Sequence, residues 1–312
     1  MNMKVLFTAV GSIGTRHVGN LTKVCQEKGI ELTIDVIRYS ERSLTDDLRK
    51  MVRREIRSDQ DIDENYDVVF ITDETKTHYD NIVKFKNRCK HMFIEKPIFD
   101  NTGYNIKDVT TTDNSIYYVA CPIRFTDYYK ILKDAVSQNE VYSARIIFSS
   151  YMPNWQKGRD YRKSFRCFSD RGGGVDIDSL HEIDYMTGLF GFPEDVKREA
   201  GHYSNIEMDA PDIADYIFRY KDKLVEMHLD YFGRTNNRRV ELFCKDDVIV
   251  IDFNKKTVTW EKKNQTESFE PDGDFYVREM RYFVELIFGN KERNINTVEN
   301  AFQNLKLAKG QV

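Results

Sequence analysis

Residues 4–21 read KVLFTAVGSIGTRHVGNL, and this stretch decides the fold of the amino-terminal part of the chain. The apolar run from Lys4 to Val10 predicts a β-strand. Gly11 and Gly14 follow it, and a helical pattern then extends from about Ile13 to Lys28. A strand, a tight glycine turn and a helix in this order form the phosphate-binding corner of a dinucleotide fold.

The turn follows the pattern GxGxxG except that Ala9 replaces the first glycine. Gly11 lets the backbone approach a pyrophosphate, and Gly14 lets the helix pack closely on the strand. The amide groups and the dipole at the helix start favour phosphate oxygens. The predicted phosphate contacts are Gly11, Ser12, Ile13 and Gly14. A plain strand-to-helix turn without a ligand is the alternative interpretation.

The end of the second predicted strand bears on the choice of cofactor. An NAD enzyme carries Asp or Glu there for the ribose 2′-hydroxyl, whereas this chain continues with Arg38, Tyr39, Ser40, Glu41 and Arg42. Two guanidinium groups and a hydroxyl suit a 2′-phosphate, so the sequence favours NADP over NAD. Arg38 would cover the adenine, and Ser40 or Arg42 would take the phosphate. A solvated basic loop is the alternative, and Glu41 weakens the preference.

Beyond this corner, short apolar runs alternate with helical stretches up to residue 121. Strands are predicted at ELTIDVI, DVVFIT, HMFIEK and IYYVACPI, and helices near 44–57 and 79–88. Such alternation predicts an N-terminal Rossmann domain, 1–121, of the α/β class with a doubly wound parallel sheet.

The remaining residues, 122–312, show a different pattern. A helix is expected at 128–136 and a final helix at 298–309, and the runs YSARIIFSSY, DIADYIFRY, LVEMHLDYF, RVELFCK and VIVIDF follow one another with partial alternation. This pattern predicts a C-terminal α+β domain with a large, mostly antiparallel open sheet, one face of which is exposed or shared with a partner.

Composition limits the classes of partner that the chain is expected to bind. The 312 residues carry a net charge of -4, from 47 basic and 51 acidic residues, and contain no long basic tract that would favour nucleic acid or an anionic membrane. The five cysteines are scattered and never form a CxxC pair, so neither a disulfide framework nor a metal site is indicated. No cleavable signal and no apolar run of about 20 residues is present. We therefore expect a cytoplasmic protein with a small-molecule partner.

Residues 172–191 read GGGVDIDSLHEIDYMTGLFG and predict one helix that carries an acid and an imidazole. At about 100° per residue, Asp178, His181 and Tyr185 share one narrow arc of that helix, which suits a general acid/base site. Most of the remaining helix surface is apolar. A buried amphipathic helix with a satisfied histidine is therefore the alternative.

The last strand of the first domain ends in Glu95, Lys96 and Pro97, at the sheet edge where open parallel sheets bind ligands. Together with the glycine turn and the later Asp and His, this lysine makes the chain resemble the Gfo/Idh/MocA family of NAD(P)-dependent oxidoreductases. The segments that carry the resemblance are GSIGTRHVGNL, FITDETKTH, EKP, IRF, SYMPNWQKGRDYRKSF, GGGVDIDSLHEIDYMTGLFG and HLDYFGR. They resemble most the branch often encoded with bacterial surface-sugar biosynthesis.

The chain departs from the family pattern at several positions. The first glycine is Ala9, a usual loop proline is Glu74, and Pro122 stands where polar residues are common. The common spacing would place the acid at Ile177, whereas this chain presents Asp178 three residues before the histidine. Members of the resembling branch share that spacing, which indicates a variant site.

The resemblance implies hydride transfer between the nicotinamide and a sugar carbon. His181 would take the hydroxyl proton while Lys96 and Asp178 position and polarise the same oxygen. The matching segments add Thr72, His78, Glu95 and Lys96 to the predicted cofactor contacts. The predicted substrate contacts are Arg124, Trp155, Asp160, Tyr161, Arg162, Asp178 and His181. The arginines of that loop could also bind a carboxylate or the phosphates of a nucleotide sugar.

The first hypothesis is thus an NADP-preferring dehydrogenase or reductase, also able to use NAD, that acts on a sugar or sugar derivative, including nucleotide-activated sugars and nonulosonic acids. We expect a homodimer or a dimer of dimers, formed through the open sheet. Two alternatives remain: an NAD-dependent glycosidase that cycles its cofactor without net redox change, and a non-catalytic dinucleotide-sensing regulator. The joint presence of Lys96, Asp178 and His181 argues against the regulator.

Overall fold

The computed structural model describes residues 1–39, 43–111, 115–155, 158–271, 273–289 and 293–312. The chain divides into two compact units. The first comprises Met1–Pro122 and Asp274–Phe302, and the second comprises Ile123–Gly273 and Gln303–Val312.

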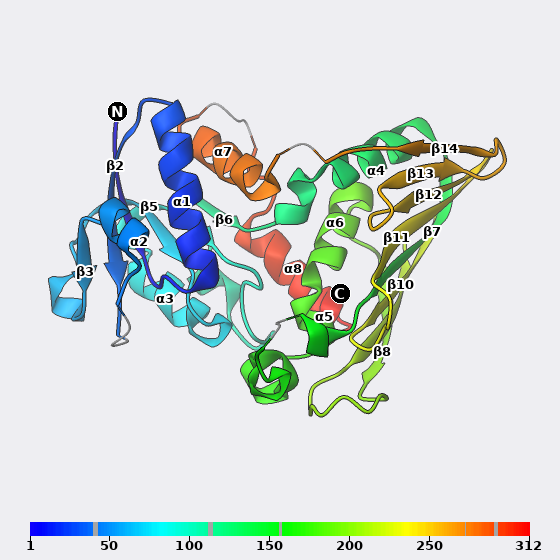
Figure 1. The fold of residues 1–312 in the computed structure, drawn as a ribbon, viewed down its shortest axis with the longest axis horizontal. Helices are drawn as coiled ribbons and strands as arrows, with labels where there is room; N and C mark the ends of the chain where they lie inside the picture. Colours follow the sequence, from blue (N-terminus) through cyan, green and yellow to red (C-terminus); the bar gives the residue numbers. More distant parts are fainter. Residues whose placement is uncertain (40–42, 112–114, 156–157, 272, 290–292) are drawn as a thin grey trace. The chain divides into compact units, whose positions relative to one another are not determined.

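The first unit is built on a six-stranded parallel sheet with the strand order β3-β2-β1-β4-β5-β6 (Figure 1). Its strands are β1 (Asn2–Phe7), β2 (Glu31–Ile37), β3 (Arg54–Ile56), β4 (Tyr66–Ile71), β5 (Cys89–Ile94) and β6 (Ile116–Val119). Its helices are α1 (Ser12–Glu27), α2 (Asp46–Met51), α3 (His78–Phe85) and α7 (Phe275–Ile287). The strand order reverses between β1 and β4. Right-handed crossovers therefore place α1 and α3 on opposite faces, and the predicted doubly wound sheet is confirmed.

Residues after the second unit return to pack on the first. Helix α7 lies along α1, where Lys28 pairs with Glu285 at 3.0 Å and Arg281 pairs with Glu27 at 2.7 Å. On its buried side, Phe283 meets the ring of Phe93 at 5.2 Å. The division of the sequence at residue 121 assigns this segment to the second domain, whereas its aromatic packing and ion pairs bind it to the first unit.

Helix α2 differs from its prediction. The expected helix over 44–57 is confined to Asp46–Met51, and β3 follows it immediately. At the start of β3, Arg53 and Arg54 both contact the buried carboxylate of Asp35 on β2, at 2.8 Å and 3.2 Å from their Nε atoms. The backbone N–H of Arg53 also donates to the carbonyl of Ile34 on β2 at 2.7 Å, a hydrogen bond that a continuing helix would lose.

The second unit is built on an eight-stranded sheet with the order β14-β13-β12-β11-β7-β10-β9-β8, in which only the β7–β10 pair is parallel. Its strands are β7 (Val141–Ser149), β8 (Asp195–Gly201), β9 (Ile213–Arg219), β10 (Leu224–Asp230), β11 (Asn237–Cys244), β12 (Val248–Asp252), β13 (Thr257–Trp260) and β14 (Gln265–Ser268). The predicted mostly antiparallel sheet is confirmed. Strands β8, β13 and β14 were not among the predicted ones.

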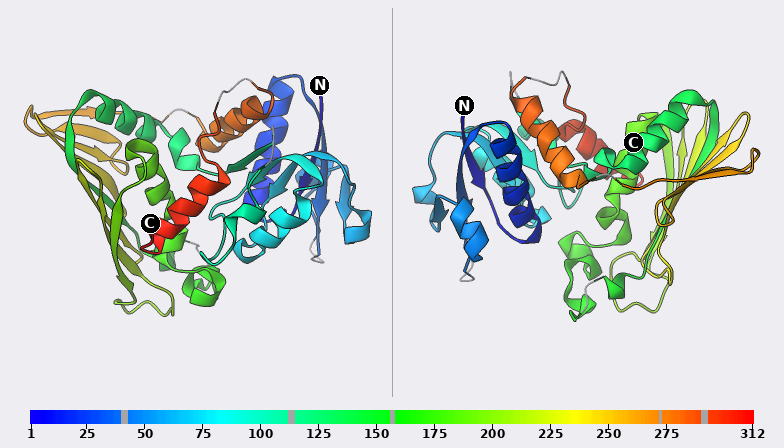
Figure 2. Two further views of the ribbon diagram at one scale, coloured as in Figure 1. Left: turned by 180° about the vertical axis from the view of Figure 1, so that it is seen from behind. Right: turned by 45° about the horizontal axis from the view of Figure 1, so that its top comes forward.

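Helices cover one face of this sheet (Figures 1 and 2). They are α4 (Asp127–Gln138), α5 (Val175–Asp178) and α6 (Leu180–Phe190). Helix α8 (Val298–Ala308) is divided between the two units, the first ending at Phe302 and the second resuming at Gln303. Along β9, Ala214, Tyr216 and Phe218 are buried towards these helices while the alternate residues are exposed. None of the helices in the described part of the chain is long and apolar enough to cross a membrane.

The helix predicted over 172–191 is interrupted. Ser179 separates α5 from α6, so Asp178 and His181 belong to different helices. Tyr185, which was predicted to share their arc, is fully buried.

Candidate functional site

The glycine turn after β1 forms a backbone cradle at the start of α1. Gly11 is the N-cap of α1, and no atom lies within 4 Å of the position that a Cβ would occupy there. At Gly14 a Cβ would clash with the carbonyl oxygen of Ala9. The turn thus has open space at Gly11 and tight packing at Gly14, which is the arrangement that binding of a pyrophosphate requires.

Thr72, which follows β4, stabilises this turn through two hydrogen bonds. Its backbone N–H donates to Thr8 Oγ1 at 3.0 Å, and its hydroxyl donates to the carbonyl of Ala9 at 2.6 Å. Its side chain is therefore committed to the turn, whereas the sequence predicts it as a direct cofactor contact.

A cleft of about 680 Å³ opens at the carboxyl ends of β1, β2 and β4, the point where the strand order reverses. Dinucleotides bind at this place in doubly wound sheets, and the volume lies in the range of small-molecule sites. The cleft is lined by Thr8, Ala9, Val10, Gly11, Ile37, Arg38, Tyr39, Asp73, Glu74, Thr77, Asp80, Asn81 and Lys84. Of the predicted cofactor contacts, Gly11 and Arg38 line it, while Ser40 and Arg42 lie outside the described residues.

The end of the cleft near β2 contains paired cations. Arg38 is only 8% exposed, and its Nε lies 3.8 Å from Glu55. Lys84 pairs with Asp59 at 2.7 Å, and the same carboxylate accepts the hydroxyl of Tyr39 at 2.6 Å. Both cations therefore already have a carboxylate partner.

His78 and Glu95 hold the backbone around Lys96. The ring nitrogens of His78 lie 3.0 Å from the carbonyl of Pro97 and 3.2 Å from that of Asp73. Glu95 Oε1 lies 2.5 Å from His17 Nε2. Burial works to raise the pKa of Glu95, but the contact with His17 and the nearby charge of Lys96 outweigh it and hold this pKa below its usual range. Both predicted cofactor residues thus act on the loop that carries Lys96.

In the second unit, Asp178 ends α5 and is held by two donors. Its Oδ2 accepts from Arg166 Nε at 2.7 Å and from the hydroxyl of Tyr231 at 3.1 Å. Arg166 also lies over the ring of Trp155, 5.6 Å from its centre. Arg166 and Tyr231 are not among the site residues predicted from the sequence. The signal was present, because Tyr231 belongs to the quoted segment HLDYFGR and Arg166 directly follows the quoted aromatic loop.

His181, in the first turn of α6, lies beside a buried carboxylate. Its Nε2 is 3.1 Å from Glu182 Oε1, and its ring meets the ring of Phe148 edge to face at 5.8 Å. Asp178 and His181 thus lie in the same unit, three residues apart across the break at Ser179, each with a charged neighbour.

In the loop predicted to bind substrate, several side chains already form hydrogen bonds or ion pairs within the protein. Trp155 is 37% exposed and its Nε1 donates to Ser150 Oγ at 2.8 Å. Asp160 binds Arg162 Nε at 2.8 Å, and the Tyr161 hydroxyl accepts from the backbone N–H of Glu207 at 3.3 Å. The loop therefore exposes the aromatic ring of Trp155 beside polar side chains, among them Asp160 and Arg162, which pair with each other.

Arg124 lies in a buried ion pair with Asp184, although the sequence predicts it as a substrate contact. Its Nε and Nη2 each donate to the carboxylate of Asp184 at 2.9 Å, and Nη2 also donates to the Asp184 carbonyl at 2.7 Å. Asn304 adds a third donor to the carboxylate at 3.1 Å. Burial raises the pKa of Asp184, and Arg124 opposes that shift.

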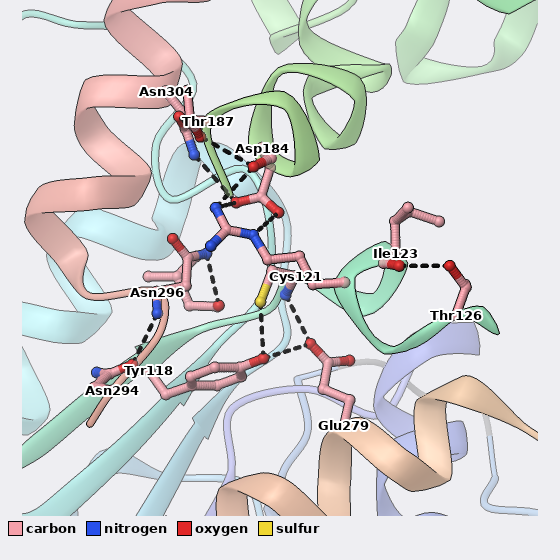
Figure 3. A network of polar contacts seen from close by, with 12 residues as sticks. Tyr118, Cys121, Ile123, Thr126, Asp184, Thr187, Glu279, Asn294, Asn296 and Asn304 are labelled. Atoms are coloured by element: carbon pink, nitrogen blue, oxygen red, sulfur yellow. Dashed lines mark hydrogen bonds and ion pairs between the residues drawn. The ribbon is translucent and has the colours of Figure 1, made fainter. Parts of the chain in front are cut away.

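A separate polar cluster in the first unit fastens the strand β6 region to α7. Glu279 Oε1 accepts from the Tyr118 hydroxyl at 2.9 Å and from the Cys121 N–H at 2.7 Å (Figure 3). In the described residues, no three His, Cys, Asp or Glu side chains gather in a way that could hold a metal ion.

Comparison with known proteins gives matches in both sequence and structure. Residues 3–113 match the model of the Gfo/Idh/MocA oxidoreductase family, described as an NAD-binding Rossmann fold. Over 204 residues the chain is 24% identical to myo-inositol 2-dehydrogenase of Thermotoga maritima. This alignment covers 61% of the chain but only 55% of that enzyme, about half of its length.

Solved structures share the fold over nearly the whole chain. The WlbA dehydrogenase from Bordetella pertussis, in complex with NADH and UDP-GlcNAcA, is similar with a TM-score of 0.80 at 14% identity, covering 99% of this chain and 95% of that one. A levoglucosan dehydrogenase in complex with NADH and levoglucosan gives a TM-score of 0.81 at 14% identity, covering 99% and 96%. The family resemblance is thus supported in the nucleotide-binding part, and the fold over the whole chain.

Proposed function

We propose that this chain is a nicotinamide-dependent oxidoreductase that transfers hydride between its cofactor and a carbon of a sugar or sugar derivative. The observation that carries the proposal is the open backbone cradle at Gly11, at the head of α1 and on the wall of the 680 Å³ cleft. The amides at the start of α1 would hold the pyrophosphate, and the cleft would take the adenosine half.

The choice of a sugar substrate draws on the similar proteins. Their names include myo-inositol 2-dehydrogenase and levoglucosan dehydrogenase, which act on polyhydroxylated rings. In this chain the partly exposed indole of Trp155 and the polar loop that follows it offer the combination of an aromatic face and hydrogen-bonding groups that suits such rings.

The proposed catalytic residues are Lys96, Asp178 and His181. When bound, the nicotinamide supplies the hydride acceptor for alcohol oxidation or the hydride donor for ketone reduction. In oxidation, His181 takes the hydroxyl proton, and Lys96 and Asp178 polarise and position the same oxygen. In reduction, His181 returns the proton to that oxygen. Proton transfer of this kind contributes about 10² to 10⁴ in rate.

This function is tested by cofactor binding and turnover together. We expect NADH or NADPH to bind, and a panel of cyclitols, free sugars and nucleotide-activated sugars to include a substrate that changes absorbance at the nicotinamide band. Lys96→Met and His181→Asn should bind the cofactor normally and lose turnover by at least about 100-fold. Full turnover in either variant would show that the substituted residue takes no part in the mechanism. The absence of cofactor binding by the native protein would refute the whole proposal.

For the cofactor we propose a preference for NADP, with NAD as a weaker alternative. Arg38 supports this assignment, because it lines the cleft at the end of β2 where an acid would otherwise repel a 2′-phosphate. The NADH complexes of the similar proteins make NAD the competing choice. Parallel titrations with the two reduced cofactors decide between them.

For the substrate we propose a sugar with an anionic group, such as a nucleotide-activated sugar or a nonulosonic acid, used in surface-polysaccharide biosynthesis. Arg159 and Lys163, which flank Asp160–Arg162, supply positive charge beside the aromatic surface. Because that charge is exposed, we expect KM for an anionic substrate to rise with ionic strength, while KM for a neutral analogue stays constant.

We also propose a homodimer, or a dimer of dimers, formed through the sheet face opposite α4 and α6. This face exposes Ile217 and Leu224, each by 47%, beside the ion pair of Arg145 with Glu226 at 2.9 Å. Light scattering should give twice the chain mass or more. Ile217→Arg should shift the protein towards monomer, and a monomeric native protein would refute the assignment.

A further inference from the structure

The imidazole of His181 is fixed by groups of its own unit. Glu182 Oε1 lies 3.1 Å from Nε2, and the Phe148 ring stands against the imidazole at an interplanar angle of 83°. A charged contact on one side and an aromatic ring on another restrict the rotation of the imidazole. His181 is therefore more firmly oriented than a surface histidine with an exposed side chain.

The carboxylate beside it is unusual in its burial. The side chain of Glu182 is fully buried, and its Oε1 lies 2.6 Å from Arg238 Nη2. Burial works to raise the pKa of Glu182, but Arg238 and His181 outweigh it, so the pKa lies below its usual range. Glu182 is thus ionised, and its charge acts on Arg238, on the imidazole of His181 and on the buried Tyr185.

Arg238 itself is held in place. Strand β11 carries it, and its guanidinium lies over two rings, 5.7 Å from the centre of Phe148 and 5.5 Å from that of Phe253. Phe148 therefore contacts both the imidazole and the guanidinium. Arg238, Glu182 and the ionisable imidazole of His181 thus form a fixed row, the charge row.

We propose that Glu182 is a positioning residue for His181, which orients the imidazole and stabilises its protonated form, and that Arg238 limits this effect by drawing on the same oxygen. The assignment rests on the proposed function of His181. A carboxylate next to an imidazole favours the cation, and a nearby guanidinium opposes it. The pair thus sets the basicity of His181 between two limits.

Other charged groups surround this row within the second unit. Asp184 on α6 also acts on His181, but its charge is largely taken by Arg124. Asp178 at the end of α5 is paired with Arg166. Glu182 also has an arginine, but its Oε1 lies only 3.1 Å from His181 Nε2. Removal of Glu182 or of its partner Arg238 should therefore change the titration of His181 most directly.

The two substitutions have opposite expected effects. Alcohol oxidation needs neutral His181. Protonation of His181 at low pH therefore lowers kcat/KM, and this decline forms the acidic limb of the pH profile. Glu182→Gln removes the stabilising charge and should move this limb to lower pH by about one unit, a tenfold change in the protonation equilibrium. Arg238→Met should move it to higher pH. Glu182→Gln should also lower kcat by about 10-fold or more because the ring loses its orientation.

The controls separate this effect from misfolding. Glu226→Gln changes an exposed glutamate on β10 that pairs with Arg145, and it should leave the pH profile unchanged. Arg238→Lys keeps the positive charge and should retain a limb close to that of the native protein. Affinity for reduced cofactor should be unaffected in all four variants. Limbs that do not move, or that move in the same direction in Glu182→Gln and Arg238→Met, would overturn the inference.

A readout independent of turnover distinguishes this inference from the proposed function. His181 is one of only six histidines in the chain, so its imidazole resonance can be assigned by comparison with His181→Asn and titrated by NMR. Suppose that the native protein has no dehydrogenase activity, but that Glu182→Gln and Arg238→Met shift the His181 titration in opposite directions. The proposed function would then be refuted, whereas the charge row would be supported. An active protein in which neither variant shifts the titration would refute the charge row alone. If Glu182→Gln fails to fold, the comparison of Arg238→Met with Arg238→Lys still decides.

Discussion

The strongest prediction concerns the ion pair of Arg124 and Asp184, because here the structure and the sequence give different roles to one residue. Their side chains are only 10% and 9% exposed, and the pair is bidentate. Removing one partner of a buried pair leaves an uncompensated charge, which costs about 3–5 kcal/mol of stability. We therefore expect Arg124→Met to destabilise the protein by that amount and to lower Tm by about 6–20 °C, at about 2–4 °C per kcal/mol for a domain of this size.

A second substitution should restore most of the loss. Asp184→Asn removes the charge and keeps a carbonyl oxygen for the amide of Asn304, which donates to Asp184 Oδ1 at 3.1 Å. The double variant Arg124→Met/Asp184→Asn should thus be more stable than Arg124→Met alone by more than half of the original loss. Urea unfolding followed by circular dichroism gives the four free energies of this cycle.

The destabilisation should also depend on pH with a defined sign. Burial raises the pKa of folded Asp184 and Arg124 opposes it, so loss of Arg124 raises this pKa further. The folded variant then binds a proton more tightly than the unfolded chain, whose Asp has a pKa of about 3.9. Its stability falls as pH rises from that value through the folded pKa, so Arg124→Met should be closer to the native protein at pH 5 than at pH 8.

A loss of less than about 1 kcal/mol in Arg124→Met, the value expected for an exposed pair, would contradict the structural role of this ion pair. A variant of native stability with a raised KM for the sugar would instead favour the substrate role that the sequence predicts. Gly188→Ala offers a further perturbation, because its Cβ would lie 2.7 Å from the Tyr129 hydroxyl and 2.9 Å from Arg124 Cζ. It should destabilise the same pair without removing either charge.

Three further predictions address the cofactor site and the sheet. Gly14→Ala should weaken NADH or NADPH binding by at least about 10-fold in fluorescence titrations, because a Cβ would clash with the turn backbone, whereas Gly19→Ala, where no atom lies within 4 Å, should bind normally. Arg38→Asp should reverse the ratio of NADPH to NADH affinity, and an unchanged ratio would remove Arg38 from cofactor choice. Hydrogen bonds with Asp230 and Asp215 raise the pKa of His228, so its stabilising effect should be complete below the unfolded pKa of about 6.5 and be lost as pH rises through the folded pKa. Thermal unfolding of His228→Gln should therefore differ from the native protein at pH 6 and converge with it at pH 9.

The nucleotide-binding part could be predicted from sequence because its signals are local. The strand, Gly11, Gly14 and the helix lie within one short stretch, and each glycine answers a backbone requirement that few other residues meet. The alternation of strands and helices likewise fixes a parallel sheet through right-handed crossovers.

The partners of individual polar residues could not be predicted in this way. Arg124 and Asp184 are 60 residues apart, and Arg238 and Glu182 belong to a strand and a helix separated by three other strands in the chain. No periodicity encodes such pairs. The break at Ser179 was missed because the sequence pattern fits one helix, and no glycine or proline stands at the break.

The acidic residues of α5 and α6 show why this segment was ambiguous in the sequence. A largely buried helical segment tolerates several carboxylates only if each has a cation, because an unpaired buried charge is strongly destabilising. Here every acid has an arginine from a different element: Asp176 with Arg198, Asp178 with Arg166, Glu182 with Arg238 and Asp184 with Arg124. The four pairs restrict the rotation and depth of α5 and α6. An acid near a histidine in such a segment is therefore not by itself a sign of catalysis, and the opposite pH shifts expected for Glu182 and Arg238 test which of these charges act on the reaction.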